Sequence, residues 1–287
     1  MNLNKKSTFT QFINKRRIFA PLFLDMNVII DIGNTRTKIA LFQKNDLDEK
    51  AIVDVLTLDA LSERLKGQTI EGVIMSVTGQ NTEGVANWLR ERYFLIELNA
   101  ETPLPIDNLY GTPQTLGKDR LAAAVAANYL FPKHNCLAMD SGTCITYNFI
   151  NNKGQFIGGN IAPGLTMRLK AMHHFTAKLP LLSRNTVEER NADTIGKGGV
   201  TELVGTTTEQ AMLNGAQIGL LSEVEGFIKR LSRSDSFGKK EFGSLKVLVT
   251  GGDGEFLYKN LNIKNVCYEP NLVLIGLNRI LNFNISQ

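Results

Sequence analysis

Residues 28–42 read VIIDIGNTRTKIALF, which is an apolar run, a polar turn and a second apolar run. Short apolar runs on either side of a turn that contains Gly and Asn are typical of two paired β-strands. We therefore expect strands at Asn27 to Asp31 and at Lys38 to Phe42, with Gly33 in the turn between them.

The same pattern returns in the middle of the chain, where residues 137–150 read LAMDSGTCITYNFI. An ungapped alignment of the two stretches places Asp31 on Asp140, Gly33 on Gly142 and Thr37 on Thr146. A D-x-G turn repeated at equivalent places predicts an α/β protein in which two similar domains face a cleft. We expect an N-terminal extension at residues 1–25, a first domain at 26–135 and a second domain at 136–287.

Further elements follow from apolar periodicity. We expect strands at Ala51 to Thr57, Gly72 to Val77, Cys136 to Asp140 and Lys246 to Thr250. We expect helices at Leu58 to Lys66, Thr82 to Arg92, Thr208 to Arg230 and Leu272 to Leu281, and an alanine-rich helix that begins near Gly117. The polar stretch from Ser183 to Thr207 predicts a loop or a partly helical insertion.

Composition favours a globular enzyme, because 43% of the 287 residues are hydrophobic and 21% are charged. The net charge is +4, and residues 1–25 carry five Lys or Arg side chains against one Asp. The rest of the chain is therefore balanced, which argues against nucleic acid and anionic membrane surfaces as partners.

The extension itself does not resemble a targeting segment. Its apolar run at residues 18–24 contains Pro21 and falls well short of the roughly 18 residues that a membrane span needs. We interpret it as a disordered basic tail or as an upstream start-site artefact, because Met26 directly precedes the first strand. Cys136, Cys144 and Cys267 form no CxxC pair, which predicts a reducing, cytoplasmic environment without disulfides or a zinc site.

A turn of the D-x-G type can surround phosphate oxygens with backbone N–H groups, and its carboxylate can help to bind Mg²⁺. A capped hairpin, with Asp31 and Asn34 as ordinary turn formers, is the alternative. The third glycine cluster, TGGDG at residues 250–254, would let a base or ribose approach the backbone, or is a bare strand-to-helix turn.

Other nucleotide-binding signatures are missing from the sequence. The stretch from Gly111 to Lys118 has five residues between its glycines instead of the four of a Walker A motif, and Asp119 stands where Ser or Thr would bind metal. Neither HRD nor DFG occurs, and no strand-borne GxGxxG precedes a helix. P-loop, protein-kinase and Rossmann interpretations are therefore disfavoured.

The three glycine motifs DIGNT, DSGT and TGGDG resemble those of the actin, hexokinase and Hsp70 ATPase superfamily. The resemblance implies an actin-like (ribonuclease H-like) fold, in which two α/β domains close over ATP. Within that superfamily, GKDR at residues 117–120, GGNIAPG at 158–164 and TAKLP at 176–180 resemble the type III pantothenate kinase family. The match runs from about Met26 to Leu281.

This resemblance implies phosphorylation of pantothenate by ATP, with Mg²⁺ and a monovalent cation, K⁺ or NH₄⁺. It assigns ATP contacts to Asp31, Ile32, Gly33, Asn34, Thr35, Arg36, Thr37, Lys38, Thr143, Gly251 and Gly252. It assigns the pantothenate pocket to Tyr110, Gly117, Lys118, Asp119 and Arg120, with Thr208 contributed across a homodimer interface. Asp140 would hold the monovalent cation, and Asp31 would bind Mg²⁺.

Two residues of GKDR have distinct expected roles. Asp119 is the candidate general base, and the forked Arg120 guanidinium suits a carboxylate. The alternative is a surface Asp–Arg pair at a helix start. Along the helix that Thr208 opens, the apolar positions Met212, Ala216 and Leu220 form either a dimer face or an ordinary core face.

Two alternative functions stay open at this point. One is a different small-molecule kinase or phosphatase of the same superfamily, in which GKDR is coincidental. The other is a non-enzymatic relative that regulates gene expression. The three carboxylates Asp31, Asp119 and Asp140 favour an enzyme, because a pure binding module has no need of them.

Overall fold

The computed structural model describes residues 25–33, 36–78, 82–182, 203–232 and 245–287. Several expectations fall outside these ranges. They concern the extension before Asp25, the turn residues Asn34 and Thr35, and most of the insertion from Ser183 to Thr207.

The first sheet has five strands in the order β3-β2-β1-β4-β5. Their bounds are β1 (Met26–Ile32), β2 (Thr37–Gln43), β3 (Asp46–Val53), β4 (Ile70–Val77) and β5 (Leu95–Glu97). β1, β2 and β3 form an antiparallel meander, while β4 runs parallel to β1 and β5 runs parallel to β4. β1 is buried along its whole length because packed elements cover both faces of the sheet.

The second sheet repeats this topology and has the order β11-β10-β7-β8-β9-β6. Its strands are β6 (Asp107–Asn108), β7 (Cys136–Ser141), β8 (Cys144–Ile150), β9 (Gln155–Pro163), β10 (Lys246–Thr250) and β11 (Val266–Tyr268). β7, β8 and β9 are again an antiparallel meander, and β10 and β11 follow in parallel. The internal repeat expected from the D-x-G turns is therefore present, with β6 added at the β9 edge.

Strand pairing corrects one detail of the ungapped alignment. Asp31 lies opposite Lys38, whereas Asp140 lies opposite Thr146. The second turn is one residue shorter than the first, so Thr146 is the counterpart of Lys38 and not of Thr37. A one-residue slip matters because it moves a side chain to the other face of the sheet.

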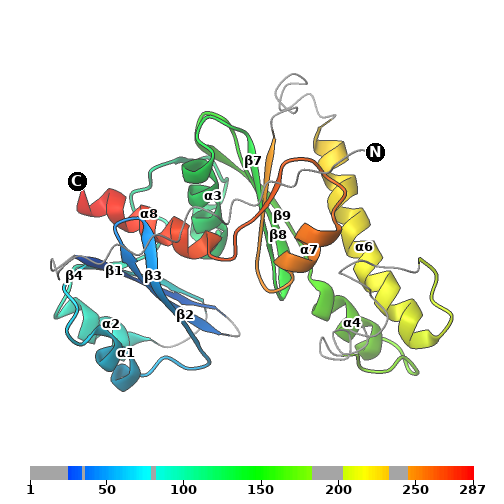
Figure 1. Cartoon of the computed structure of the whole chain (residues 1–287), viewed down its shortest axis with the longest axis horizontal. Helices are drawn as coiled ribbons and strands as arrows, with labels where there is room; N and C mark the ends of the chain where they lie inside the picture. Colours follow the sequence, from blue (N-terminus) through cyan, green and yellow to red (C-terminus); the bar gives the residue numbers. More distant parts are fainter. Residues whose placement is uncertain (1–24, 34–35, 79–81, 183–202, 233–244) are drawn as a thin grey trace, which may run out of the picture.

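The helices make three layers around the two sheets (Figure 1). α1 (Leu58–Leu65) and α2 (Glu83–Arg90) cover the outer face of the first sheet. α3 (Lys118–Leu130) and α8 (Leu272–Ile285) lie between the sheets and pack against strands of both. α4 (Leu165–His174), α6 (Thr208–Leu231) and α7 (Gly254–Asn260) cover the outer face of the second sheet. A short 3₁₀ helix, η2 (Pro113–Thr115), precedes α3.

The middle layer depends on small residues. The alanines of α3 are fully buried, and an ideal Cβ on Gly276 of α8 would lie 1.9 Å from the carbonyl oxygen of Ala122. The two helix backbones therefore approach closely, and α3 is placed against both sheets. The alanine-rich helix expected near Gly117 is confirmed.

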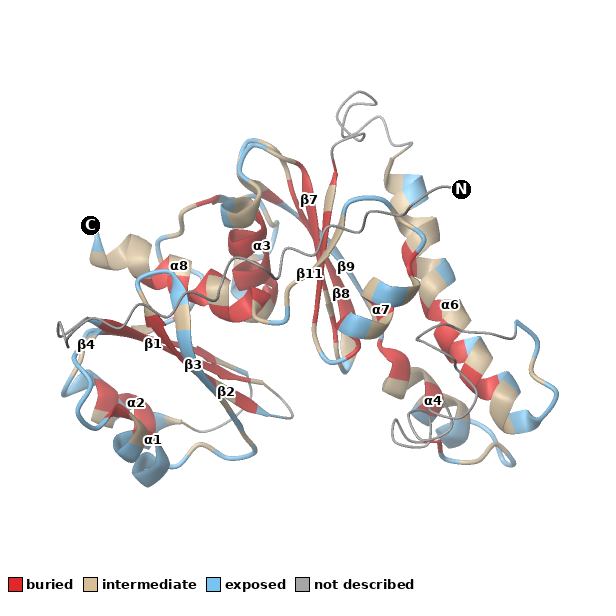
Figure 2. Ribbon diagram, viewed as in Figure 1, coloured by how far each residue is buried: buried red, intermediate tan, exposed pale blue. Residues whose placement is uncertain are grey.

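Two segments differ from expectation. The strand expected at Ala51 to Thr57 is β3, which begins at Asp46 after a tight turn with a positive φ of 56° at Lys44. Figure 2 shows this edge strand as largely exposed, so its charged residues hide the apolar signal that sequence reasoning needs. The GGNIAPG segment, for which no strand was expected, forms the second half of β9 up to Pro163, and its last residue, Gly164, precedes α4.

In the described ranges no helix combines the length and the apolarity that crossing a membrane requires.

The domain limits at residues 26–135 and 136–287 remain a prediction. The α3–α8 layer is the region that both halves share.

Candidate active site

Asp31 and Asp140 are the penultimate residues of the equivalent strands β1 and β7. Strand alternation puts each on the face of its sheet that meets the α3–α8 layer. The third carboxylate, Asp119, lies in the first turn of α3. The fold thus brings to one place three carboxylates that are far apart in sequence.

The charges of these groups act on one another, which indicates that they lie in the same region. The pKa of Asp140 is raised to about 6, chiefly by burial, with Lys38 opposing the shift and the charges of Asp119 and Asp31 adding to it. Burial also raises the pKa of Asp31, with Lys38 again opposing, Asp119 adding, and a hydrogen bond from Ser76 opposing. Like charges near a shared site raise one another's pKa, and a bound cation relieves that repulsion.

Lys38 supplies the positive charge in this group. It lies opposite Asp31 in the β1–β2 pair, with its Nζ atom 3.9 Å from the Asp31 Oδ2 atom. Among the described residues no group of three or more His, Cys, Asp or Glu side chains could hold a metal alone. A metal here would draw further ligands from water or substrate, as Mg²⁺ commonly does, and the carboxylate donors fit a hard cation.

Three glycine segments meet at the turn after β7. The Gly164 N–H donates to the Thr143 carbonyl at 3.1 Å, and a Cβ on Gly164 would lie 2.1 Å from the Gly142 carbonyl oxygen. Gly251 has a φ of 89°, and its Cβ would lie 2.3 Å from the Asp140 Oδ1 atom. GGNIAPG and TGGDG therefore press directly on DSGT, and only glycine fits at these contacts.

The first turn is described only in part. The Gly33 N–H donates to the Arg36 carbonyl at 3.1 Å, and Arg36 is exposed. Thr37 and Ile32 lie on the strand face turned toward α1 and α2, opposite to the Asp31 face. Their side chains therefore do not join the carboxylate group.

Arg120 is the best-defined residue of the predicted pantothenate pocket. It is 4% exposed, and its Nε atom donates to the Asn148 Oδ1 atom at 2.8 Å. Its guanidinium lies 5.4 Å from the centroid of the Tyr110 ring, while its buried Nη2 atom has no hydrogen-bond partner. An unpartnered buried donor is costly, so this arrangement suits an anionic ligand. The alternative of a surface Asp–Arg pair is wrong.

Aromatic and amide side chains surround Arg120. Tyr110 stacks on Phe156 with ring centroids 6.0 Å apart, and a Cβ on Gly158 would lie 3.5 Å from the Tyr110 ring. Asn148 is fully buried and donates to the Thr146 hydroxyl at 3.1 Å. Sequence reasoning missed Asn148, although an amide at an inward position of an apolar strand was a usable signal.

The other residues of GKDR act on the start of α3. A Cβ on Gly117 would lie 2.6 Å from the Asp119 Oδ1 atom, which accepts a hydrogen bond from the Arg120 N–H at 2.9 Å. Lys118 donates from Nζ to the Val77 carbonyl at 3.2 Å, so its ammonium ties α3 to the end of β4. Thr143 and Gly252 are exposed at the mouth of their turns.

Thr208 is not brought to this group within one chain. It is exposed at the start of α6, which packs on the outer face of the second sheet, whereas α3 lies on the inner face. Met212, Ala216 and Leu220 are buried in the chain's own core, so of the two alternatives the ordinary core face is the one present.

Comparisons with known proteins agree with this geometry. The sequence profile of the type III pantothenate kinase family matches residues 27–230. A type III pantothenate kinase from Phocaeicola vulgatus is 42% identical over 263 residues, covering 90% of this chain and 99% of the relative.

Two solved structures share the fold at low sequence identity. A Campylobacter jejuni protein assigned to the Baf family of transcriptional activators has a TM-score of 0.56 at 20% identity, covering 91% of this chain and all of its own. Component A of the (R)-2-hydroxyglutaryl-CoA dehydratase from Acidaminococcus fermentans has a TM-score of 0.50 at 14% identity, covering 92% of this chain and all of its own. Two repeated α/β halves of the actin-like fold, a carboxylate cluster between them and an extensive sequence match lead to one conclusion: the chain belongs to the type III pantothenate kinase family.

Proposed function

We propose that this protein transfers the γ-phosphoryl group of ATP to the terminal hydroxyl of pantothenate, the first step of coenzyme A biosynthesis. One observation carries the assignment beyond family membership. The Arg120 guanidinium is buried and its Nη2 atom has no hydrogen-bond partner. The preceding residue, Asp119, raises the pKa values of Asp31 and Asp140 through its charge. This is an anion site for the acceptor beside a phosphate site for the donor.

The phosphate site is formed by the two repeated turns. The N–H groups and side chains of Asn34, Thr35 and Thr143 would surround the phosphates, with Gly33 shaping the first turn, and Lys38 would neutralise part of the phosphate charge. Gly251 and Gly252 would let the ribose or base approach the backbone, and the close contact of Gly251 with Asp140 places this segment beside the phosphate site. Contacts with ATP would come only from the backbone, or from the exposed edge of the phosphate site, at Ile32, Arg36 and Thr37.

Asp119 is the proposed general base. Phosphoryl transfer needs in-line positioning, charge neutralisation and an acceptor for the hydroxyl proton. Asp119 provides the acceptor, and Arg120, Asn148 and Tyr110 hold the pantothenate carboxylate end. The hydrogen bond from Lys118 to the Val77 carbonyl ties the start of α3, and with it Asp119, to the end of β4.

Asp31 is the proposed ligand of Mg²⁺ and Asp140 that of K⁺ or NH₄⁺. Such cations would neutralise part of the charge of the phosphates. The raised pKa values of both carboxylates support this assignment, because a cation offsets the desolvation and repulsion that produce the shifts.

We further infer a homodimer in the cytoplasm. The exposed position of Thr208, on the opposite side of the second sheet from Arg120, supports its use by a neighbouring subunit. The cytoplasmic assignment rests on the unpaired cysteines and on the metabolic role.

An ADP-release assay tests the proposal, with pantothenate, glucose or acetate as acceptor, each with K⁺ or with Na⁺ at equal ionic strength. We expect ADP release that depends on pantothenate and is stimulated by K⁺. Release with glucose or acetate alone would instead assign the protein to another kinase of the superfamily. No acceptor-dependent release by folded, ATP-binding protein would favour the regulatory alternative.

A further inference from the structure

One partly buried polar network outside the carboxylate site reaches the phosphate turn. Arg168, in the first turn of α4, donates from Nε to the Pro163 carbonyl at 2.9 Å and forms an ion pair with Glu223 of α6. The second carboxylate oxygen of Glu223 accepts a hydrogen bond from the Tyr147 hydroxyl at 2.7 Å. The network therefore joins α4, α6 and β8.

The decisive contact is at the peptide group between Pro163 and Gly164. Its carbonyl accepts from Arg168, and its N–H donates to the Thr143 carbonyl at 3.1 Å. Because a peptide group is planar, a bond at one end fixes the direction of the other. Arg168 thereby orients the N–H that holds Thr143, the exposed residue of the DSGT turn.

The side chains of this network are largely shielded from water. The side chains of Arg168 and Glu223 are 20% and 34% exposed, and Tyr147 is 2% exposed. Burial and the adjacent Glu223 raise the pKa of Tyr147, so its hydroxyl stays protonated and donates to the carboxylate. Glu223 is then fixed by β8 and in turn fixes Arg168.

We propose that Arg168 and Glu223 are positioning residues for nucleotide binding, acting on the turn at Thr143 through the Pro163–Gly164 peptide. The proposal rests on the proposed function only in that this turn meets ATP phosphates. Neither residue touches the pantothenate pocket around Arg120, so the effect should be selective for the nucleotide. Loss of a hydrogen bond from a charged group changes the equilibrium constant of the process that depends on it by about tenfold.

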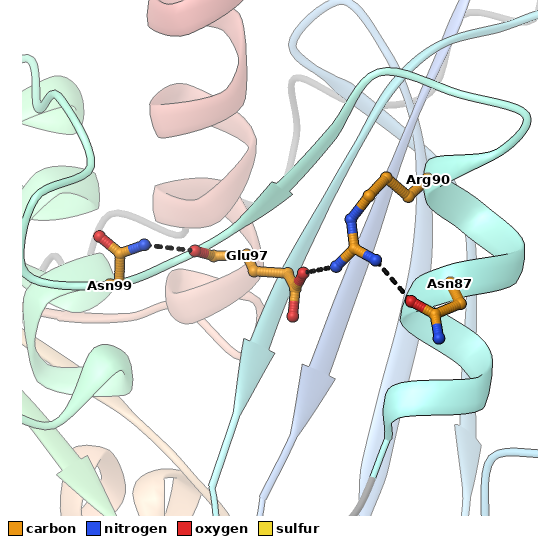
Figure 3. A network of polar contacts seen from close by, with 4 residues as sticks. All are labelled: Asn87, Arg90, Glu97 and Asn99. Atoms are coloured by element: carbon orange, nitrogen blue, oxygen red, sulfur yellow. Dashed lines mark hydrogen bonds and ion pairs between the residues drawn. The ribbon is translucent and has the colours of Figure 1, made fainter.

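The test compares Arg168→Met and Glu223→Gln with Arg90→Met. Figure 3 shows the control network, in which Arg90 bridges Asn87 of α2 and Glu97 of β5. This arginine also joins a helix to another element, but it lies on α2 against the first sheet, and its partners Asn87 and Glu97 belong to no glycine turn. Glu223→Gln keeps an acceptor for Tyr147 while removing the charge that holds Arg168.

We expect Arg168→Met to raise the KM for ATP about tenfold with the KM for pantothenate nearly unchanged, and Glu223→Gln to act in the same direction. Arg90→Met should change neither. Hydrogen exchange of ligand-free protein gives a readout without catalysis: the peptide around Gly164 should exchange faster in Arg168→Met and not in Arg90→Met. If Arg168→Met folds poorly, Glu223→Gln carries both measurements.

A purely structural role predicts something else: a lower Tm with both KM values and the exchange at Gly164 unchanged. That result overturns the proposal. If wild-type protein releases no ADP with pantothenate, the proposed function fails, and the exchange experiment still decides whether Arg168 holds the peptide.

Discussion

Asp31 and Asp140 occupy equivalent strand ends, but the residues opposite them differ. Lys38 faces Asp31, whereas the uncharged Thr146 faces Asp140. Burial raises the pKa of Asp140 to about 6 from an ordinary value of 3.8. The folded state therefore binds a proton at Asp140 that the unfolded state has already released, and this group favours folding less as pH rises from about 4 to about 6.

The first prediction follows from this loss of stability with rising pH. Without K⁺ the Asp140 carboxylate should lower stability at pH 8 by about 1–3 kcal/mol relative to its protonated form. A bound K⁺ needs the ionised form, so the gain in Tm on replacing NaCl by KCl should be small at pH 5 and larger at pH 8. Asp140→Asn should remove that difference, and an unchanged K⁺ response in this variant would contradict the cation assignment.

Asp119 carries the second prediction. Asp119→Asn keeps the shape of the side chain and removes the proton acceptor, so kcat should fall by about 10²- to 10⁴-fold with little change in the KM for ATP. Steady-state kinetics measures both constants. Asp46→Asn, on the exposed edge strand β3, is the matched control. Near-normal turnover in Asp119→Asn would remove Asp119 from the role of base.

At the scale of elements, the glycine contacts give a third prediction. Gly164→Ala would put a methyl group 2.1 Å from the Gly142 carbonyl oxygen, so β9 or the phosphate turn must move. ATP binding, measured by calorimetry, should weaken at least tenfold. Gly215→Ala in α6 meets nothing within 4 Å and should leave binding intact while stabilising the helix by up to about 1 kcal/mol. Equal affinity in both variants would show that the turn tolerates displacement.

The sequence predicted some elements well and others poorly, for physical reasons. β1, β2, β7, β8 and α3 are buried on both sides, so their apolar runs are continuous and readable. β3 is an exposed edge, and the GGNIAPG half of β9 is rich in glycine, so neither carries the pattern of a strand.

The residues of the site likewise fall into those that sequence motifs reveal and those that only the folded structure reveals. The D-x-G turns and GKDR stand out as motifs, whereas the amide of Asn148 and the Arg168–Glu223 pair become visible only through contacts across the fold. Thr37 shows a limit of motifs, because its side chain lies on the strand face turned toward α1 and α2, so that a contact with ATP would have to come from its backbone.

At the scale of the whole molecule, the last helix of the chain completes the layer beneath the first sheet. α8 packs against α3, β1 and β4, and its Asn278 accepts a hydrogen bond from Asn27 at the start of β1, at 2.8 Å. The two halves therefore share a core, which a linear division of the sequence could not foretell.

The fourth prediction tests this shared core. Gly276→Ala would place a methyl group 1.9 Å from the Ala122 carbonyl oxygen and should lower the free energy of unfolding by about 1–3 kcal/mol. Gly226→Ala, in open space on α6, is the control. Denaturant unfolding should remain one transition, because both sheets rest on the α3–α8 layer. A separate early transition would indicate halves that unfold independently.

The final prediction concerns the assembly, and it depends on Thr208 and Asp119 lying on opposite sides of the second sheet within one chain. If a neighbouring subunit supplies Thr208, each pocket combines Asp119 of one copy with Thr208 of the other. Asp119→Asn and Thr208→Trp should each be inactive alone.

In a mixed dimer of these two variants, one pocket carries both defects and the other carries neither. Since half of the dimers in an equal mixture are mixed, co-refolding should restore about a quarter of wild-type activity. Native mass spectrometry would confirm that mixed dimers form, and refolded mixtures of each variant with itself are the controls. No recovery despite abundant mixed dimers would place each pocket within a single subunit, because both defects would then disable separate sites.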